Sequence, residues 1–427
     1  MLRCILLLAV LCSAPALAAD RFDALHEEGL QAYTGKDYAR LEQLMREAEP
    51  LRPQHPRTLY NLAAALALQG RGDEALPLLQ QLADLGLSYS AATDADFASL
   101  ADNPAFQALA KRFEANLQRV GRGAFVFSGG VPRFIADGLA YDRFARTFYM
   151  TSARERRVLL VTPELERLSL VNTASNGLWS ALGVYLEQNN NRLWVASSAL
   201  PMMEGYEPSQ AGRAGIFVYD SRNGNLRNRY LMPEDGVHHE LTDLVLSPRG
   251  VVYAVDRAEG RLYTVDRKSG DYQALTEPGA LHTPQGLTLS EDSRSLYIAD
   301  SALGLFRYDV RARSLSPMPL PAGVSPYGLD GIYLYKDSLV AVRNGFLPYQ
   351  VLQFRLNGKG DAVSRARVLL SSHPDFEHPG GGLVSGRHFY FIANSQWNRI
   401  GKDHRVPPNT QMRRPVVLRV DVSDDWD

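Results

Sequence analysis

The chain has 427 residues, of which 45% are hydrophobic and 22% are charged, and its formal net charge at pH 7 is −1. This composition is typical of a globular protein with a sizeable core, and the length favours two domains over one. The near-neutral charge argues against a nucleic-acid partner, which would call for a basic surface patch.

The first residues have the pattern of a cleaved secretory signal. The segment MLRCILLLAVLCSAPALAAD carries Arg3, then an apolar run, then the small-residue ending ALAA. This order predicts a signal peptide over residues 1–19, cut after Ala18 or Ala19, and therefore an exported protein of the bacterial periplasm or medium. The run is too short for a comfortable membrane span, and no later segment approaches the roughly 18 apolar residues that a span requires.

Both cysteines of the chain, Cys4 and Cys12, lie inside this signal. Val10 and Leu11, which precede Cys12, are not the small pair that a lipoprotein signal would place there. The mature protein is therefore expected to have no disulfide, no thiol nucleophile and no thiolate metal site. Its stability would have to come from burial.

Residues 20–120 are predicted to form a helical domain. In TLYNLAAALALQGRGDEALPLLQQLADLG, apolar residues recur at helical spacing on both sides of a Gly-containing turn. One unit upstream, Gly35 corresponds to Gly70 and Ala39 to Ala75. A period of about 34 residues resembles the tetratricopeptide repeat. A third, shorter hairpin follows, with Asn103-Pro104 as its cap and first-turn pair.

This helical domain has two possible roles that the sequence leaves open. Its repeats could form a groove that binds a protein partner, or they could act as a structural cap or a dimer contact.

Residues 121–427 are predicted to form an all-β domain, because the apolar period changes to two and turns arrive every ~8–12 residues. One unit appears six times, starting at Asp137, Leu182, Thr242, Gln285, Asp330 and Gly381. The spacing of these starts suits four-stranded blades, so we expect a six-bladed propeller. The last unit lacks a fourth strand, and GAFVFSGG, which precedes the first unit, is expected to supply it and hide an exposed edge.

Three long loops are expected at the mouth of the propeller channel. The loops between second and third strands are short in units one, three and four and long in units two, five and six. Long loops gathered on one face favour function, although they could also only shield blade edges. The candidate ligand-binding residues on these loops are Met203, Tyr206, Phe346, Tyr349, Trp397 and Arg399.

With DGLAYD, TDL, PQGLTLSEDSRSLYIADS and LDGIYL in this order, the predicted propeller resembles the senescence-marker-protein/gluconolactonase family. Members of that family hold one calcium ion in the channel through a Glu, two Asn and an Asp, and hydrolyse lactones or related esters. Matched position by position, the resemblance implies calcium ligands at Asp137, at Thr242 or its neighbour Asp243, at Gln285 and at Asp330. Only Asp330 is unchanged, but every replacement keeps an oxygen donor, as calcium requires.

The resemblance implies an exported calcium-dependent hydrolase that takes a small lactone or ester at the channel mouth. The ion would polarise a carbonyl, and a channel carboxylate, Asp330 or Asp137, would act as the general base. The alternative is a non-enzymatic propeller that binds a ligand or protein, with the helical repeats as a docking module.

Four histidines are further candidates for a catalytic base, and four aspartates could have structural roles. His238, His239, His282 and His378 precede strand starts near the expected mouth, where a His can act as a base because its pKa lies near neutrality. Asp137, Asp243 and Asp330 could instead be turn formers ahead of the strands. Asp300 is expected to be structural and to bond backbone amides between blades.

Overall fold

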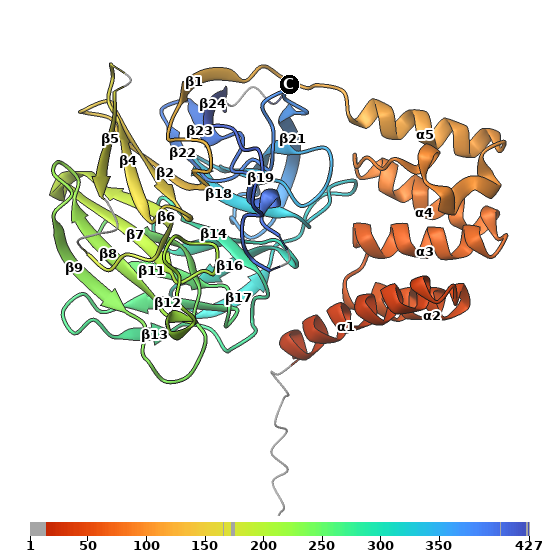
Figure 1. Ribbon diagram of the computed structural model, residues 1–427, viewed down its shortest axis with the longest axis horizontal. Coiled ribbons are helices and arrows are strands. Elements are labelled where there is room, and N and C mark those ends of the chain that lie inside the picture. The colour runs from red at the N-terminus through yellow and green to blue at the C-terminus, as the bar shows by residue number, and fades with distance from the viewer. Residues whose placement is uncertain (1–13, 165, 172–175, 402, 424–425, 427) are drawn as a thin grey trace, which may run out of the picture.

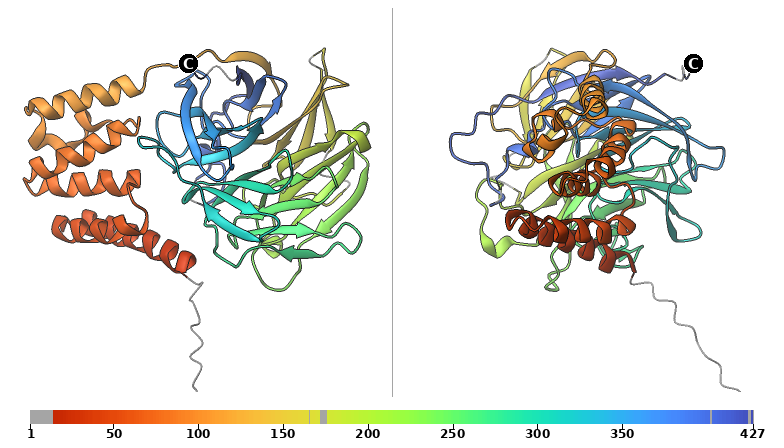
Figure 2. Two further views of the ribbon diagram at one scale, coloured as in Figure 1. Left: turned by 180° about the vertical axis from the view of Figure 1, so that it is seen from behind. Right: turned by 90° about the vertical axis from the view of Figure 1, so that its right-hand side faces the viewer.

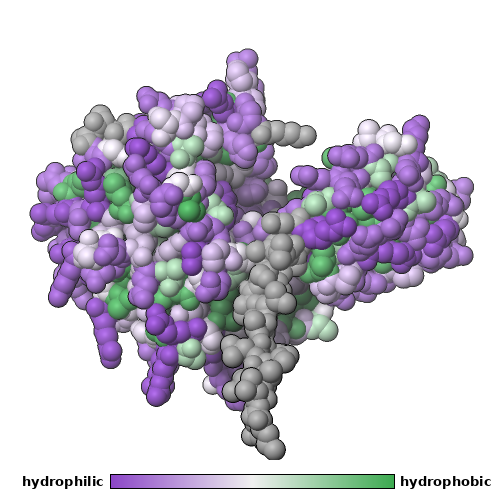
Figure 3. Space-filling model, turned by 90° about the horizontal axis from the view of Figure 1, so that it is seen from below, coloured by the Kyte–Doolittle hydropathy of each residue, from purple (hydrophilic) through white to green (hydrophobic). Residues whose placement is uncertain are grey.

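The computed structural model describes residues 14–164, 166–171, 176–401, 403–423 and 426, which form a stack of helices followed by a ring of antiparallel sheets (Figure 1). Residues 1–13, most of the predicted signal peptide, lie outside the described residues. Among the described residues, no helix is long and apolar enough to cross a membrane. In the view of Figure 3, hydrophilic side chains cover most of both parts and hydrophobic ones are scattered.

The helical region stacks its helices side by side, next to the propeller (Figure 2). Its elements are α1 (Ala14–Thr34), α2 (Tyr38–Ala48), η1 (Glu49–Leu51), α3 (Pro56–Leu68), α4 (Gly72–Asp84), η2 (Ala91–Thr93), η3 (Ala95–Leu100) and α5 (Pro104–Asn116). Their apolar faces form one core, in which Leu44, Met45 and Leu79 are fully buried. The Asn103 side chain accepts the N–H of Ala105 and caps α5, as predicted. A helical region is thus confirmed, whereas its assignment to the tetratricopeptide repeat stays a prediction.

Six four-stranded sheets form the propeller, as predicted. Blade one contains β2 (Ala136–Asp142), β3 (Thr147–Ser152), β4 (Arg157–Val161) and β5 (Arg167–Val171), and blade two contains β6 (Ser180–Glu187), β7 (Arg192–Ser198), β8 (Ala214–Asp220) and β9 (Leu226–Leu231). Blade three contains β10 (Leu241–Leu246), β11 (Val252–Asp256), β12 (Arg261–Val265) and β13 (Tyr272–Ala274), and blade four contains β14 (Pro284–Leu289), β15 (Ser295–Asp300), β16 (Gly304–Asp309) and β17 (Ser314–Pro317). Blade five contains β18 (Leu329–Tyr335), β19 (Ser338–Arg343), β20 (Gln350–Leu356) and β21 (Val363–Ser371).

Blade six is assembled from both ends of the propeller. Its sheet has the order β1-β24-β23-β22, from β1 (Ala124–Ser128), β22 (Gly382–Ser385), β23 (His388–Ile392) and β24 (Val416–Asp421). The strand that precedes blade one therefore completes the last blade, which confirms the predicted closure. Because β1 pairs antiparallel with β24, the ring cannot open between the first and last blades without breaking this ladder.

Apolar burial between blades holds the ring together. One hydrophobic cluster fills each of the six interfaces between neighbouring blades. Between blades five and six, for example, Val340, Phe389 and Phe391 are fully buried. Each such side chain contributes about 1.5–3 kcal/mol relative to exposure, so the closed ring is the main source of the propeller's stability.

The buried carboxylate of Asp300 is structural, as predicted, but the backbone amides that it bonds flank strands of one blade and do not join two blades. Its two oxygens accept the backbone N–H groups of His282 and Thr283 before β14 and of Ala302 and Leu303 after β15. Four amide donors satisfy the charge of this fully buried group, so Asp300 fixes the turns at the mouth end of blade four.

The helical region packs on loops of blades four and five (Figure 2). The Tyr327 hydroxyl, just before β18, donates to the Pro53 carbonyl oxygen at 2.9 Å, and the Ser88 N–H donates to the Leu347 carbonyl oxygen at 2.8 Å. The loop before β18 and the loop after β19 both lie at the end of blade five where its first strand begins. The helices therefore flank the channel mouth on one side.

Candidate functional site

A cavity of about 510 Å³ lies on the axis of the propeller. Residues at or near the start of the first strand of every blade, β2, β6, β10, β14, β18 and β22, line it. Asp137, Asp243, Gln285 and Asp330 come from four different blades and meet around this one space. The channel geometry thus brings together the residues that the sequence pattern selected as candidate ligands.

Irregular pairing at the strand starts directs these side chains into the cavity. The register between first and second strands shifts around Asp137, Thr242, Gln285 and Asp330 in blades one, three, four and five. Such a bulge bends the strand locally and re-aims a side chain. In blade two the bulge contains Gly183, where an added Cβ would lie 2.4 Å from Asp243 Oδ1.

In blade three it is Asp243 that brings a carboxylate into the cavity. The hydroxyl of Thr242 donates to the Pro284 carbonyl oxygen at 3.0 Å, so this hydroxyl is already engaged by the backbone. Asp243 Oδ1 accepts the N–H of Leu244 at 2.8 Å, and Oδ2 accepts that of Leu287 in the next blade at 3.1 Å. Burial nevertheless raises the pKa of Asp243 to about 7, while the two amide donors oppose the rise.

The carboxylate of Asp330 is held by a side-chain amide. Asn344 Nδ2 donates to Asp330 Oδ2 at 2.5 Å and to the Pro379 carbonyl oxygen at 2.8 Å, and it lies 3.3 Å from His378 Nδ1. Burial raises the pKa of Asp330 to about 6, against the hydrogen bond from Asn344. Burial also lowers the pKa of His378 to about 4, so this cavity-lining imidazole is neutral near pH 7.

Asp137 is the channel carboxyl whose ionisation is most opposed by its neighbours. Burial raises its pKa well above the usual range, and the charges of Asp330 and Asp243 raise it further. The Arg257 guanidinium and the Trp397 indole act in the opposite direction. Similar carboxyls in one cavity thus have different proton affinities, which is the pattern found where one acid holds a proton and another gives it up.

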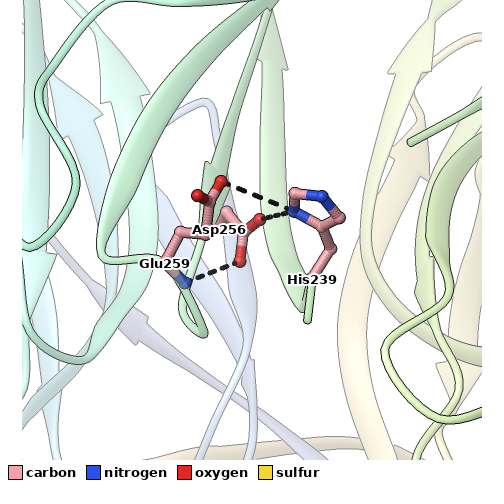
Figure 4. A group of neighbouring side chains, drawn as sticks. All are labelled: His239, Asp256 and Glu259. Carbon is pink, nitrogen blue, oxygen red and sulfur yellow. Dashed lines mark hydrogen bonds and ion pairs between the residues drawn. The ribbon is translucent and has the colours of Figure 1, made fainter. Parts of the chain in front are cut away.

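Among the described residues that line the cavity, one guanidinium, that of Arg257 in blade three, faces these acids. Arg257 and Glu240 both line the cavity and form an ion pair. Behind them, His239 Nδ1 lies 2.7 Å from Asp256 Oδ2 and 3.5 Å from Glu259 Oε2 (Figure 4). Asp256 Oδ1 accepts the Glu240 N–H at 2.9 Å, so the buried His239–Asp256 pair anchors the backbone that presents Glu240.

Two long loops meet over the cavity. Apolar contacts join residues of the β7–β8 loop to residues of the loop between β23 and β24, namely Leu200 and Met202 with Trp397, Ile400, Val406 and Met412. Trp397, at the start of η6 (Trp397–Arg399), also lines the cavity itself. The long loops of blades two and six therefore shape the mouth together.

The other candidate ligand-binding residues do not line this cavity. Met203 and Tyr206 pack in the core between blades one and two. Phe346 packs against the helical core. Tyr349 lies 6.2 Å from the His378 ring, and Arg399 pairs with Glu377. A side chain's direction in a long irregular loop is set by tertiary contacts, which is why sequence position did not separate Trp397 from these residues.

The four histidines are distributed differently from one another. His378 alone of the four lines the cavity. His239 lies behind the wall, and His282 Nε2 lies 3.0 Å from Asp23 Oδ2 of the helical region. His238 is exposed beside the β7–β8 loop.

The oxygen donors of the cavity suit a hard cation, but their positions limit how it can bind. Calcium holds its ligands at about 2.3–2.6 Å, so two ligands of one ion lie at most about 5 Å apart. Among the described residues, the only group of three His, Cys, Asp or Glu ligand atoms within 4.8 Å of one another is His239, Asp256 and Glu259. One ion could therefore take at most about two of the three channel aspartates directly in this arrangement.

Several residues of the cavity wall were not among those predicted from the sequence. Arg257, Ser301 and Asn344 each follow the last residue of the second strand of their blade and line the cavity. This shared position was a usable signal. Tyr333 also lines the cavity, and its hydroxyl oxygen accepts the Gly382 N–H at 2.6 Å, but nothing local distinguishes it from other strand tyrosines.

No protein-family model matches the chain, and no curated protein matches it either. Solved structures that resemble it include a gluconolactonase from Xanthomonas campestris, with 14% identity, a TM-score of 0.46 and coverage of 69% of this chain and 88% of that one. The calcium-binding protein regucalcin from Agrobacterium tumefaciens has 14% identity, a TM-score of 0.48 and coverage of 71% and 97%.

An aldose sugar dehydrogenase from Streptomyces coelicolor, solved with bound PQQ, has 11% identity, a TM-score of 0.47 and coverage of 71% and 99%. The six-bladed fold expected from the sequence motifs is confirmed by the six four-stranded sheets of the structure itself. Identities and TM-scores this low do not show that this protein shares an activity with any of these proteins.

Proposed function

We propose that this protein hydrolyses a small lactone or ester in the propeller channel. The observation that supports this is the set of three partly buried carboxyls, Asp137, Asp243 and Asp330, with pKa values raised by desolvation around one cavity. Carboxyls with strongly raised pKa values in a cleft are candidates for a functional site.

Asp330 is the proposed general base. A pKa of about 6 leaves it mostly ionised near pH 7, and Asn344 fixes one of its oxygens. It accepts a proton from a water molecule whose oxygen attacks the carbonyl carbon. Asp137, which holds its proton, donates it to the alkoxide as the ring carbon–oxygen bond breaks. One water is added to the lactone, and the product is the hydroxy acid.

A calcium ion in the channel is part of the proposal. It would be held by the carboxylates of Asp243 and Asp330 and by the Gln285 amide, with Asp137 as a ligand only in its ionised form, and it would supply polarisation of the substrate carbonyl. We also propose that the protein acts outside the cytoplasm, because its first 19 residues have the composition of a cleaved signal.

A lactone panel tests the proposal. Protein that begins at residue 20 is incubated with lactones and esters, with calcium and with chelator, and acid release is followed. Asp330→Asn should lower the rate about 10²–10⁴-fold, the usual contribution of a general base. Asp309→Asn, which changes the Asp at the end of β16, outside the cavity, is the matched control. No turnover of any substrate in either condition, or equal rates in both variants, would refute the proposal.

A non-enzymatic binding protein is the second candidate. It is favoured by the helical region beside the channel mouth and by the backbone hydrogen bonds that occupy Thr242 and both oxygens of Asp243. A small molecule that raises the melting temperature without being converted would support this candidate over the first.

A further inference from the structure

The side chains that line the cavity include more carboxyl groups than cationic groups. Four carboxyl groups, those of Asp137, Glu240, Asp243 and Asp330, face one guanidinium, that of Arg257, among the described lining residues. Arg257 already pairs with Glu240. The charge of Arg257 also opposes the rise that burial causes in the pKa of Asp137 and Asp330, whereas no described cation is close enough to oppose the rise in the pKa of Asp243.

One metal ion would not contact all of this wall. At most about two of the three aspartates can contact a single calcium ion in this arrangement, because no three of their oxygens lie within 4.8 Å of one another. An organic cation differs, because its N–H donors extend over several ångströms and can reach carboxylates from separate blades.

Asp243 is the best placed of the three to hold such a cation. Each of its oxygens accepts one backbone N–H, and a carboxylate oxygen has a second lone pair to offer. These amides fix the carboxylate on the β10–β14 side of the cavity. Trp397 lines the same space, and indole is the aromatic ring with the strongest attraction for ammonium groups.

We propose that the ligand of this cavity carries a protonated amine next to its lactone or ester group, with Asp243 as the residue that selects it. The lactone or ester group of this ligand is inferred from the proposed function. Its amine is inferred from the carboxyl groups of the cavity wall. Asp243 is a specificity residue in this scheme, while Asp330 and Asp137 act on the ester.

Three substituted γ-butyrolactones of nearly equal size test the proposal. They carry an aminomethyl, a hydroxymethyl or a carboxylate group, and kcat/KM is compared at low ionic strength. We expect the aminomethyl lactone to exceed the hydroxymethyl lactone by at least about tenfold, with the carboxylate last, and the differences to shrink in high salt. Asp243→Asn should collapse the ratio of aminomethyl to hydroxymethyl rates, whereas Asp309→Asn should keep it.

A binding measurement separates this inference from the proposed function. The corresponding lactams are not hydrolysed as readily, and their effect on the melting temperature reports binding without turnover. If no lactone is hydrolysed, the proposed activity is refuted. A larger rise in melting temperature with the aminomethyl lactam than with the other two would still support a ligand that carries a protonated amine. Equal shifts with all three lactams, a preference for the carboxylate, or a shift with calcium that abolishes the aminomethyl effect would overturn the inference.

Discussion

Replacing Asp330 by Asn should stabilise the protein near pH 8 while it removes activity. Burial raises the pKa of Asp330 from 3.8 to about 6, so between these values the native state binds more protons than the unfolded state. The free energy of unfolding therefore falls as pH rises through this window and stays lower above it. About two pKa units correspond to about 3 kcal/mol, which is the most that the uncharged Asn could return.

Urea unfolding of both proteins near pH 4 and near pH 8 measures this difference. We expect Asp330→Asn to be more stable by about 1–3 kcal/mol at the higher pH and nearly equal at the lower pH. Asp309→Asn is the control, because backbone N–H donors, first that of Ala312, lower the pKa of Asp309 and reverse the sign of its contribution. A loss of stability in Asp330→Asn at the higher pH, or a gain independent of pH, would refute the reasoning.

Three further predictions follow from contacts around the channel. Asn344→Leu removes the donor to Asp330, so the pKa of Asp330 should rise and the acidic limb of the pH–rate profile should move up by about one unit; an unmoved limb would exclude Asp330 as the base. Tyr327→Phe removes the hydrogen bond to Pro53 and should lower the stability of this contact by about 1 kcal/mol. Hydrogen exchange in α3 and its preceding loop should then be faster, and unchanged exchange would count against this contact. Saturating calcium, at 100 times its Kd, should stabilise the parent protein by about 2.7 kcal/mol and Asp330→Asn less, whereas a flat melting temperature would show that the channel does not hold the ion.

Local patterns in the sequence were enough to predict the architecture. The change from helical to two-residue periodicity separates the α1–α5 region from the sheets, and six similar units with regular turns give the blades. The missing fourth strand of the last unit, together with GAFVFSGG ahead of the first, led to the closure by β1 that the sheet order confirms. The structural role of Asp300 was also predicted, and its carboxylate oxygens accept four backbone N–H groups.

Only some of the residues that line the cavity could be predicted from the sequence. Asp137, Gln285 and Asp330 could be placed at the channel because they begin similar units. The choice between Thr242 and Asp243 could not be made, because a one-residue register shift at the start of β10 decides which side chain turns inward. Arg257 was missed because it belongs to a second strand's end rather than to a first strand's start.

The sequence by itself determined the helices, the six blades and their closure, since periodicity, turn residues and repeats act over neighbouring positions. Only the tertiary structure decided which side chains share the cavity. Phe346 belongs to a long loop at the channel mouth but packs on the helical core, and Trp397, on another such loop, lines the cavity. Their directions depend on contacts between segments far apart in the chain, and no local pattern encodes such contacts.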